Sequence, residues 1–76
     1  MDKILGLETI EEHFNVLKNG RIYRLVIDTT EKVLIEKALE HTSGNQIVAS
    51  KMLGLNRNTL RTKIRKLNID MGRFKT

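Results

Sequence analysis

The fold of this chain is decided by residues 45–67, which read NQIVASKMLGLNRNTLRTKIRKL. Apolar residues recur at helical spacing on both sides of Gly54-Leu55-Asn56, so the stretch predicts two short helices, about 46–53 and 57–67, joined by a tight turn. Every charged residue of the stretch is Lys or Arg. A helix-turn-helix whose second helix is basic at its exposed positions is suited to entering a groove of DNA.

The ends of these two helices carry recognisable capping residues. Asn45 and Asn56 are the expected N-caps, because an asparagine side chain accepts a hydrogen bond from an unpaired N–H of the first turn. Gly54 and Asn68 are the expected stops, since Gly and Asn tolerate the left-handed conformation that closes a helix. The residues expected on the inner faces are Val48, Ala49, Met52, Leu53, Leu60, Ile64 and Leu67.

Two longer helices are predicted upstream. The first spans about 7–18, where Leu7, Ile10, Phe14 and Leu17 recur at helical spacing before Asn19-Gly20. The second spans about 21–42, which contains no Gly or Pro. Its apolar arc is wide, so its early half is expected to pack on a partner subunit and its later half, from Leu34 onward, on the helix-turn-helix. The β-branched run near Asp28 leaves open a break into two pieces.

Charge is divided unevenly along the chain. Residues 1–44 hold six Lys or Arg and eight Asp or Glu, a net charge of −2. Residues 45–76 hold eight Lys or Arg and one acid, Asp70, a net charge of +7, which together gives the +5 of the whole chain. Such an asymmetry predicts a polyanionic partner, and double-stranded DNA fits the helix-turn-helix.

The composition excludes several other classes. With no cysteine, the chain has neither disulfides nor a Cys-based zinc site, which favours a cytoplasmic location. No apolar run approaches the ~18 residues of a membrane span. The chain has no nucleophile–base pair, metal-ligand spacing or phosphate loop, so we predict neither an enzyme nor a cofactor or metal site, and His13 and His41 are interpreted as surface residues. A 76-residue chain with three aromatic residues builds a small core, which a partner subunit would complete.

The predicted DNA-binding residues lie mainly on the outer face of the second short helix. Arg57 is the expected base reader, because its guanidinium can bond both O6 and N7 of guanine. Asn58 can pair with adenine or bond a phosphate, and Thr59 serves either as a contact or as a local cap. The remaining basic side chains suit phosphate contacts. The full set is Asn45, Asn56, Arg57, Asn58, Thr59, Arg61, Thr62, Lys63, Arg65 and Lys66.

Residues 39–64 resemble the Fis family, and the likeness extends more loosely over 7–69. This family comprises the factor for inversion stimulation and the C-terminal domains of NtrC-type transcription activators. The matching residues are Gly44-Asn45-Gln46, Ala49-Ser50, Leu53-Gly54 and Asn56-Arg57-Asn58-Thr59-Leu60. Ile47, Val48 and Thr62 depart from the contact residues of the inversion factor.

The resemblance implies an all-α homodimer with four helices per chain. Residues 1–44 of two chains would interlock as a four-helix bundle, residues 45–69 would form the DNA-binding helix-turn-helix, and residues 70–76 are expected to be a flexible tail. Family roles give Asn56, Arg57 and Thr59 as DNA contacts and Asn45 as a backbone contact. The expected dimer interface consists of Ile10, Phe14, Leu17, Ile22, Leu25 and Val26.

The function predicted from these features is sequence-preferring DNA binding by a bacterial transcription regulator. The C-terminal domain of an NtrC-type activator is favoured, because the chain begins almost directly at the bundle. The resemblance implies that such a domain is fused to an ATPase absent from this chain and serves promoters of an alternative sigma factor. The alternative is a free-standing nucleoid-associated protein that bends DNA. A remote alternative is a protein-interaction module that uses its basic helix.

Overall fold

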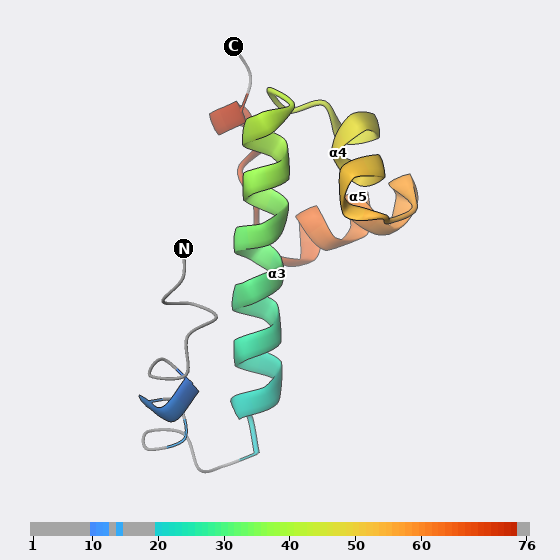
Figure 1. The fold of residues 1–76 in the computed structure, drawn as a ribbon. Helices are drawn as coiled ribbons and strands as arrows, with labels where there is room; N and C mark the ends of the chain where they lie inside the picture. Colours follow the sequence, from blue (N-terminus) through green and yellow to red (C-terminus); the bar gives the residue numbers. More distant parts are fainter. Residues whose placement is uncertain (1–9, 13, 15–19, 75–76) are drawn as a thin grey trace. The chain divides into compact units, whose positions relative to one another are not determined.

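A computed structural model of the chain describes residues 10–12, 14 and 20–74 (Figure 1). These residues form helices α3 (Ile22–His41), α4 (Gln46–Leu53) and α5 (Arg57–Lys66), followed by the 3-10 helix η1 (Met71–Phe74). Residues 10–12 and 14 are also helical, and no strand occurs among the described residues. The predicted all-α class is confirmed. The rest of the helix expected over 7–18, including Leu17, lies outside the described residues.

The chain divides into two compact units, Met1–Glu31 and Lys32–Thr76. The division falls within α3, which is one continuous helix from Ile22 to His41. The break considered near Asp28 does not occur. β-branched residues weaken a helix by only about 0.5 kcal/mol each, and this segment contains no Gly or Pro to interrupt it. Within the described residues, no helix is both long and apolar enough to span a membrane.

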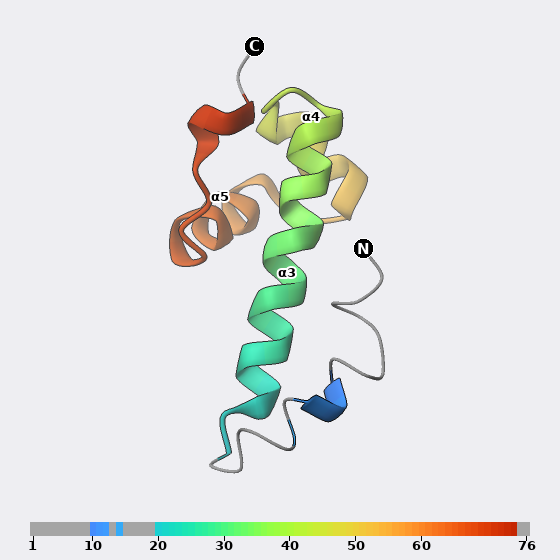
Figure 2. The same cartoon turned by 90° about the vertical axis from the view of Figure 1, so that its left-hand side faces the viewer.

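The second unit is built around a small aliphatic core. Leu39 of α3 and Leu60 of α5 are its largest fully buried side chains. Figure 2 shows α5 and η1 beside the C-terminal half of α3. The buried apolar residues, which come from every helix of the unit and the segment after α5, are Ile35, Ala38, Leu39, Ala49, Leu60, Ile64, Ile69 and Phe74. Leu53, Leu55, Leu67 and Met71 pack against this cluster.

The turns around α4 form as the capping residues predict. Gly44 and Gly54 adopt φ of 85° and 71°, in the left-handed region that suits glycine. The N–H of Gly44 donates to the carbonyl of Leu39 at 2.9 Å and thereby closes α3. The N–H of Leu55 donates to the carbonyl of Ser50 at 2.9 Å, so the chain reverses sharply between α4 and α5.

Three apolar residues that were expected to face the core are exposed instead. Val48 and Met52 on α4 are 44% and 57% exposed, and Leu34 on α3 is 56% exposed. The buried side of α4 is centred on Ala49 and Ser50, whose small side chains allow close packing. Only this side of the eight-residue helix is buried, and Val48 and Met52 lie outside it.

Part of the segment expected to be a flexible tail, residues 70–76, has regular structure. Residues Met71–Phe74 form a 3-10 helix, and Phe74 is only 5% exposed. The physical reason is the shortage of large apolar side chains in the helices. Phe74 supplies the only aromatic ring among the buried residues of the core cluster, and burying it removes a large apolar surface from water.

The two left-handed glycines allow a matched test of this packing. A Cβ added to Gly44 would lie 3.3 Å from the carbonyl oxygen of Phe74, whereas one added to Gly54 would meet nothing within 4 Å. Gly54→Ala should therefore lower the free energy of unfolding by the conformational penalty alone, roughly 1–2 kcal/mol. Gly44→Ala should lower it further, because the new methyl crowds Phe74. Urea denaturation measures both, and equal losses would contradict the close contact.

Candidate nucleic-acid interface

Helix α5 buries one narrow stripe and exposes the rest. Leu60 and Ile64 are buried in the core, and Leu67 packs against it at the end of the helix. Lys63 is half-buried at one flank. The outer face carries seven exposed candidates for DNA contact: Arg57, Asn58, Thr59, Arg61, Thr62, Arg65 and Lys66. The burial of the apolar stripe therefore fixes which side chains face solvent.

The start of α5 is fixed by its N-cap. Asn56 has extended backbone angles, φ −67° and ψ 143°, and its side-chain oxygen accepts a hydrogen bond from the N–H of Asn58 at 2.8 Å. The cap holds Arg57 in the first turn with its side chain exposed. One turn later, the hydroxyl of Thr62 donates to the carbonyl of Asn58 at 3.0 Å. That bond occupies the proton that Thr62 would otherwise offer to a phosphate oxygen.

The start of α4 is capped in the same way. The side-chain oxygen of Asn45 accepts a hydrogen bond from the N–H of Val48 at 3.2 Å. The N–H groups of the first helical turn have no carbonyl partner within the helix, so this end carries partial positive charge. Gln46, the first residue of α4, stands at this end.

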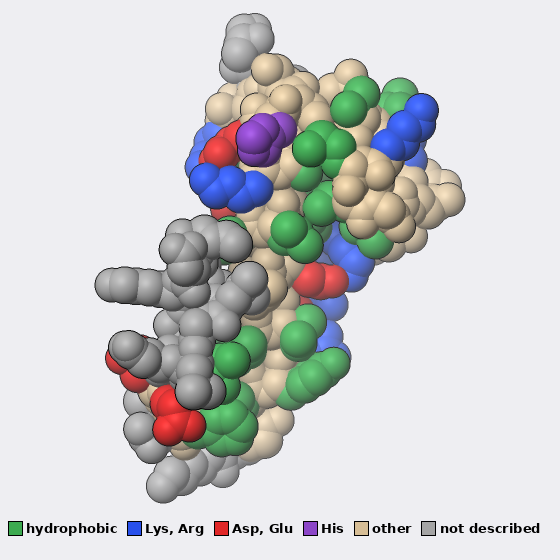
Figure 3. Space-filling view, viewed as in Figure 1, with side chains coloured by type: hydrophobic (Ala, Val, Ile, Leu, Met, Phe, Trp, Pro, Cys, Tyr) green, Lys and Arg blue, Asp and Glu red, His purple; other side chains and the backbone are tan. Residues whose placement is uncertain are grey.

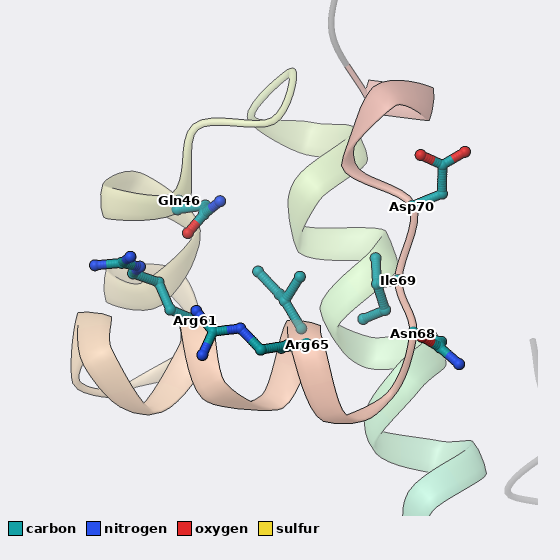
Figure 4. Close-up of a pocket in the computed structure, with 7 residues that line it drawn as sticks. Gln46, Arg61, Arg65, Asn68, Ile69 and Asp70 are labelled. Carbon is teal, nitrogen blue, oxygen red and sulfur yellow. The ribbon is translucent and has the colours of Figure 1, made fainter.

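A surface hollow of about 470 Å³ lies between α4, α5 and the segment after α5. In Figure 4 the side chains of Arg61 and Arg65 extend from α5 on the side where Gln46 begins α4. Ile64 and Ile69 also line the hollow. Its polar lining consists of Gln46, Arg61, Arg65, Asn68 and Asp70. Two guanidinium groups and two side-chain amides line one hollow, together with the Asp70 carboxylate. The guanidinium and amide groups form a set of donors that suits a phosphate group.

The sequence did not identify all of this hollow. Arg61 and Arg65 were predicted as phosphate contacts, but Gln46, Asn68 and Asp70 were not among the predicted site residues. The predicted cap at Asn45 and the predicted helix over 46–53 did place Gln46 in the first turn of α4. Its position beside Arg61 and Arg65 depends on how α4 crosses α5, and no spacing in the sequence encodes that crossing.

The electrostatic character of the second unit follows from where its acids lie. Asp70 is the only acid among residues 45–76, and its Oδ1 accepts a hydrogen bond from the N–H of Gly72 at 3.0 Å. Glu36 on α3 pairs with Arg73 at 3.1 Å, and Glu40 pairs with Lys37 at 3.4 Å. Helix α5 itself carries no acid. Its exposed face therefore carries basic side chains and no acid of the same helix.

The predicted dimer-interface residues lie in the first unit, and the structure brings four of them to one place. Ile10, Phe14, Ile22 and Val26 line an apolar hollow of about 380 Å³. Leu25 does not line it and borders a different hollow with Arg24 and Asp28. Leu17 lies outside the described residues. Figure 3 shows hydrophobic side chains gathered over the first half of α3.

Among residues 10–12, 14 and 20–74, no group of three or more His, Asp or Glu side chains is arranged to hold a metal ion. His41 is exposed at the end of α3, and His13 lies outside the described residues.

Comparisons with known proteins identify a family and several relatives of this chain. Residues 26–67 match the model of the family described as "Bacterial regulatory protein, Fis family". The chain is 44% identical over 68 residues to the DNA-binding transcriptional regulator NtrC of Azospirillum brasilense, covering 84% of this chain and 14% of that protein. It is 41% identical over 49 residues to the DNA-binding protein Fis of Aliivibrio fischeri (strain MJ11), covering 64% of this chain and 50% of that protein.

A second protein named Fis aligns over more of the chain. The Fis protein of Buchnera aphidicola subsp. Schizaphis graminum is 32% identical over 72 residues, covering 90% of this chain and 73% of that protein. The chain thus spans about 14% of the length of its NtrC relatives and half or more of its Fis relatives. No solved structure matches the chain.

The capping role of Asn56 is testable by stability. Asn56→Ala removes the acceptor for the N–H of Asn58 and should lower the free energy of unfolding by about 1 kcal/mol. Asn56→Asp keeps an acceptor at the same place and is the control, with a loss well below that of the alanine variant. Thermal unfolding followed by circular dichroism measures both. If Asn56→Ala leaves the free energy of unfolding unchanged, the hydrogen bond does not stabilise the start of α5.

Proposed function

The chain belongs to the Fis family of bacterial regulatory proteins, and on that premise we propose that it is a sequence-preferring DNA-binding domain of a transcription regulator. One observation carries the proposal. The outer face of α5 exposes Arg57 and Asn58 in its first turn and further basic residues behind them, with no acid on the helix. This distribution suits a recognition helix whose first turn meets base edges and whose later residues lie beside phosphates.

In this proposal Arg57 is the main base reader. Its exposed guanidinium stands at the start of α5, the end of a recognition helix that approaches the floor of the major groove. A bidentate contact with O6 and N7 of guanine would use its fork geometry. Asn58 and Thr59 lie beside it on the same exposed turn and are the next candidates for base or sugar contacts.

Phosphate contacts would come from two further groups of residues. Gln46, Arg61 and Arg65 surround the hollow between α4 and α5, which we assign to one backbone phosphate. Lys63 and Lys66 extend the basic surface toward the end of α5. Such contacts raise the affinity for any duplex and fix the register in which Arg57 reaches its base.

A homodimer is part of the proposal. In the first unit, Phe14, Tyr23, Leu25 and Ile27 are exposed although apolar or aromatic, with Tyr23 at 77%. Together with the apolar hollow of Ile22 and its neighbours, these side chains suit burial against a second copy of the chain. A two-fold dimer would read a palindromic site whose half-sites lie about one helical turn, ~34 Å, apart.

Between the two kinds of relative, we favour the domain of an NtrC-type activator over a free-standing Fis-like nucleoid protein. The NtrC relatives align over 84% of the chain or more at 43–44% identity, whereas the Fis relative that covers a similar share is 32% identical. In that setting the domain would anchor a larger regulator, with an ATPase domain outside this chain, to chromosomal DNA in the cytoplasm. Genome-fragment selection followed by binding to the enriched site distinguishes the two readings. A palindromic site bound ~10³-fold more tightly than random duplex favours the activator, and a shallow preference with strong bending favours the nucleoid protein.

Arg57 and Lys66 should respond differently to substitution. Arg57→Ala should weaken binding to the selected site by ~1–3 kcal/mol per half-site while changing random duplex much less. Lys66→Ala should weaken both duplexes comparably and reduce the salt slope by about 1. Fluorescence anisotropy at several salt concentrations measures both variants. If Arg57→Ala lowers the affinity for selected and random DNA equally, Arg57 is not a base reader.

The dimer is tested at Val26, which lines the apolar hollow of the first unit. Val26→Asp places a charge in that surface and should convert a dimer to a monomer in sedimentation-equilibrium experiments, because a buried unpaired carboxylate is strongly unfavourable. Thr29→Asp is the control, since Thr29 is exposed on the same helix and does not line the hollow. A wild-type chain that stays monomeric at high micromolar concentration would exclude the homodimer.

A further inference from the structure

The segment after α5 folds back onto the core of the second unit. The N–H of Ile69 donates to the carbonyl of Ile64 at 3.0 Å, which turns the chain at Asn68, a residue with φ of 57°. Ile69 and Phe74 are then both buried with the core residues of α3. We call residues 69–74 the C-terminal clip. All of it lies beyond residues 26–67, the part of the chain that matches the family model.

The C-terminal clip contacts the turn that precedes α4. A Cβ on Gly44 would lie 3.3 Å from the carbonyl oxygen and 3.5 Å from the Cβ of Phe74, so the backbone of the turn rests against this residue. Gly44 is followed directly by Asn45, which caps α4. Phe74 therefore supports the turn that determines where α4 begins.

An ion pair holds the clip on α3. The Nη1 of Arg73 lies 3.1 Å from the Oε2 of Glu36, and the two side chains are 51% and 18% exposed. The guanidinium carbon of Arg73 also lies 5.0 Å from the centre of the Phe74 ring. Arg73 thus closes an ion pair with α3 and covers the aromatic ring that supports the turn.

We propose that Arg73 and Phe74 are positioning residues for DNA recognition. They hold the turn at Gly44, and through it the start of α4, where Gln46 lines the same hollow as Arg61 and Arg65. Ile69 and Asp70 of the clip line that hollow directly, so the clip forms one of its walls. The recognition unit therefore extends to Phe74 and does not end with α5. This inference rests on the proposed DNA binding.

Loss of this positioning and loss of a positive charge should have different effects on the ratio of selected-site affinity to random-duplex affinity. Binding to random duplex depends mainly on the number of cations near phosphates, and a displaced α4 leaves the cations of α5 in place. Binding to a selected site also requires that phosphate contacts hold α5 in register with the bases. Perturbing the clip should therefore lower the ratio of selected-site affinity to random affinity.

A charge swap separates positioning from direct contact by Arg73. Arg73→Glu places two carboxylates together and should weaken binding to the selected site about tenfold or more. The double variant Glu36→Arg/Arg73→Glu restores an ion pair and the wild-type net charge, and should recover most of that loss. Lys37→Glu is the matched control, because it changes the net charge equally and breaks the exposed Lys37–Glu40 pair on the same helix. If the double variant binds as weakly as Arg73→Glu, the positioning role of Arg73 is overturned.

Phe74 is tested separately at a temperature where each variant is fully folded by circular dichroism. Phe74→Ala should lower the ratio of selected to random affinity about tenfold and shift the amide resonance of Gln46. The control Ile35→Ala perturbs the same core from α3 and should leave the ratio unchanged. A folded Phe74→Ala variant with the wild-type ratio would refute the inference. If the wild-type chain binds no duplex at low salt, the proposed function fails, and this inference fails with it.

Discussion

The arrangement of this protein depends on the burial of Leu60 and Ile64 against the C-terminal half of α3. These two side chains are the only buried residues of α5, and they enter a core that includes the fully buried Leu39. A ten-residue helix that is strongly polar overall has little else to hold it in place. Their burial determines the orientation of α5, and so determines that Arg57, Arg61 and Arg65 face solvent together.

The small side chains of α4 allow it to pack closely against the core in which Leu60 and Ile64 of α5 are buried. Ala49 and Ser50 are both buried, and the hydroxyl of Ser50 donates to the carbonyl of Ile47 at 2.8 Å, so its polar group is satisfied. Larger side chains at these positions would push α4 away from its neighbours. The capped ends and left-handed turns then join the helices with very few residues between them.

Basic residues have two different environments in the C-terminal part of the chain, one on the exposed face of α5 and one in the C-terminal clip. The exposed positions of α5 carry basic side chains and no acid, whereas Arg73 of the clip forms an ion pair with Glu36 and contacts the ring of Phe74. A basic residue in the DNA-binding half of the chain is therefore not automatically a DNA contact. A predicted contact residue can also be engaged within the fold: the hydroxyl of Thr62 donates to the backbone of its own helix.

The sequence by itself determined the local elements of this protein. The limits of α4 and α5, the caps Asn45 and Asn56, the left-handed Gly54 and Asn68, and the exposed basic face of α5 all follow from residue type and spacing, because capping and helical periodicity act within a few residues. Only the tertiary structure decided which apolar side chains are buried: Met52, Val48 and Leu34 are exposed, and Phe74 enters the core. It also decided that Gln46 and Asp70 share a hollow with Arg61 and Arg65. Those outcomes depend on how helices cross and on which distant side chain fills the remaining space, and no local pattern encodes either.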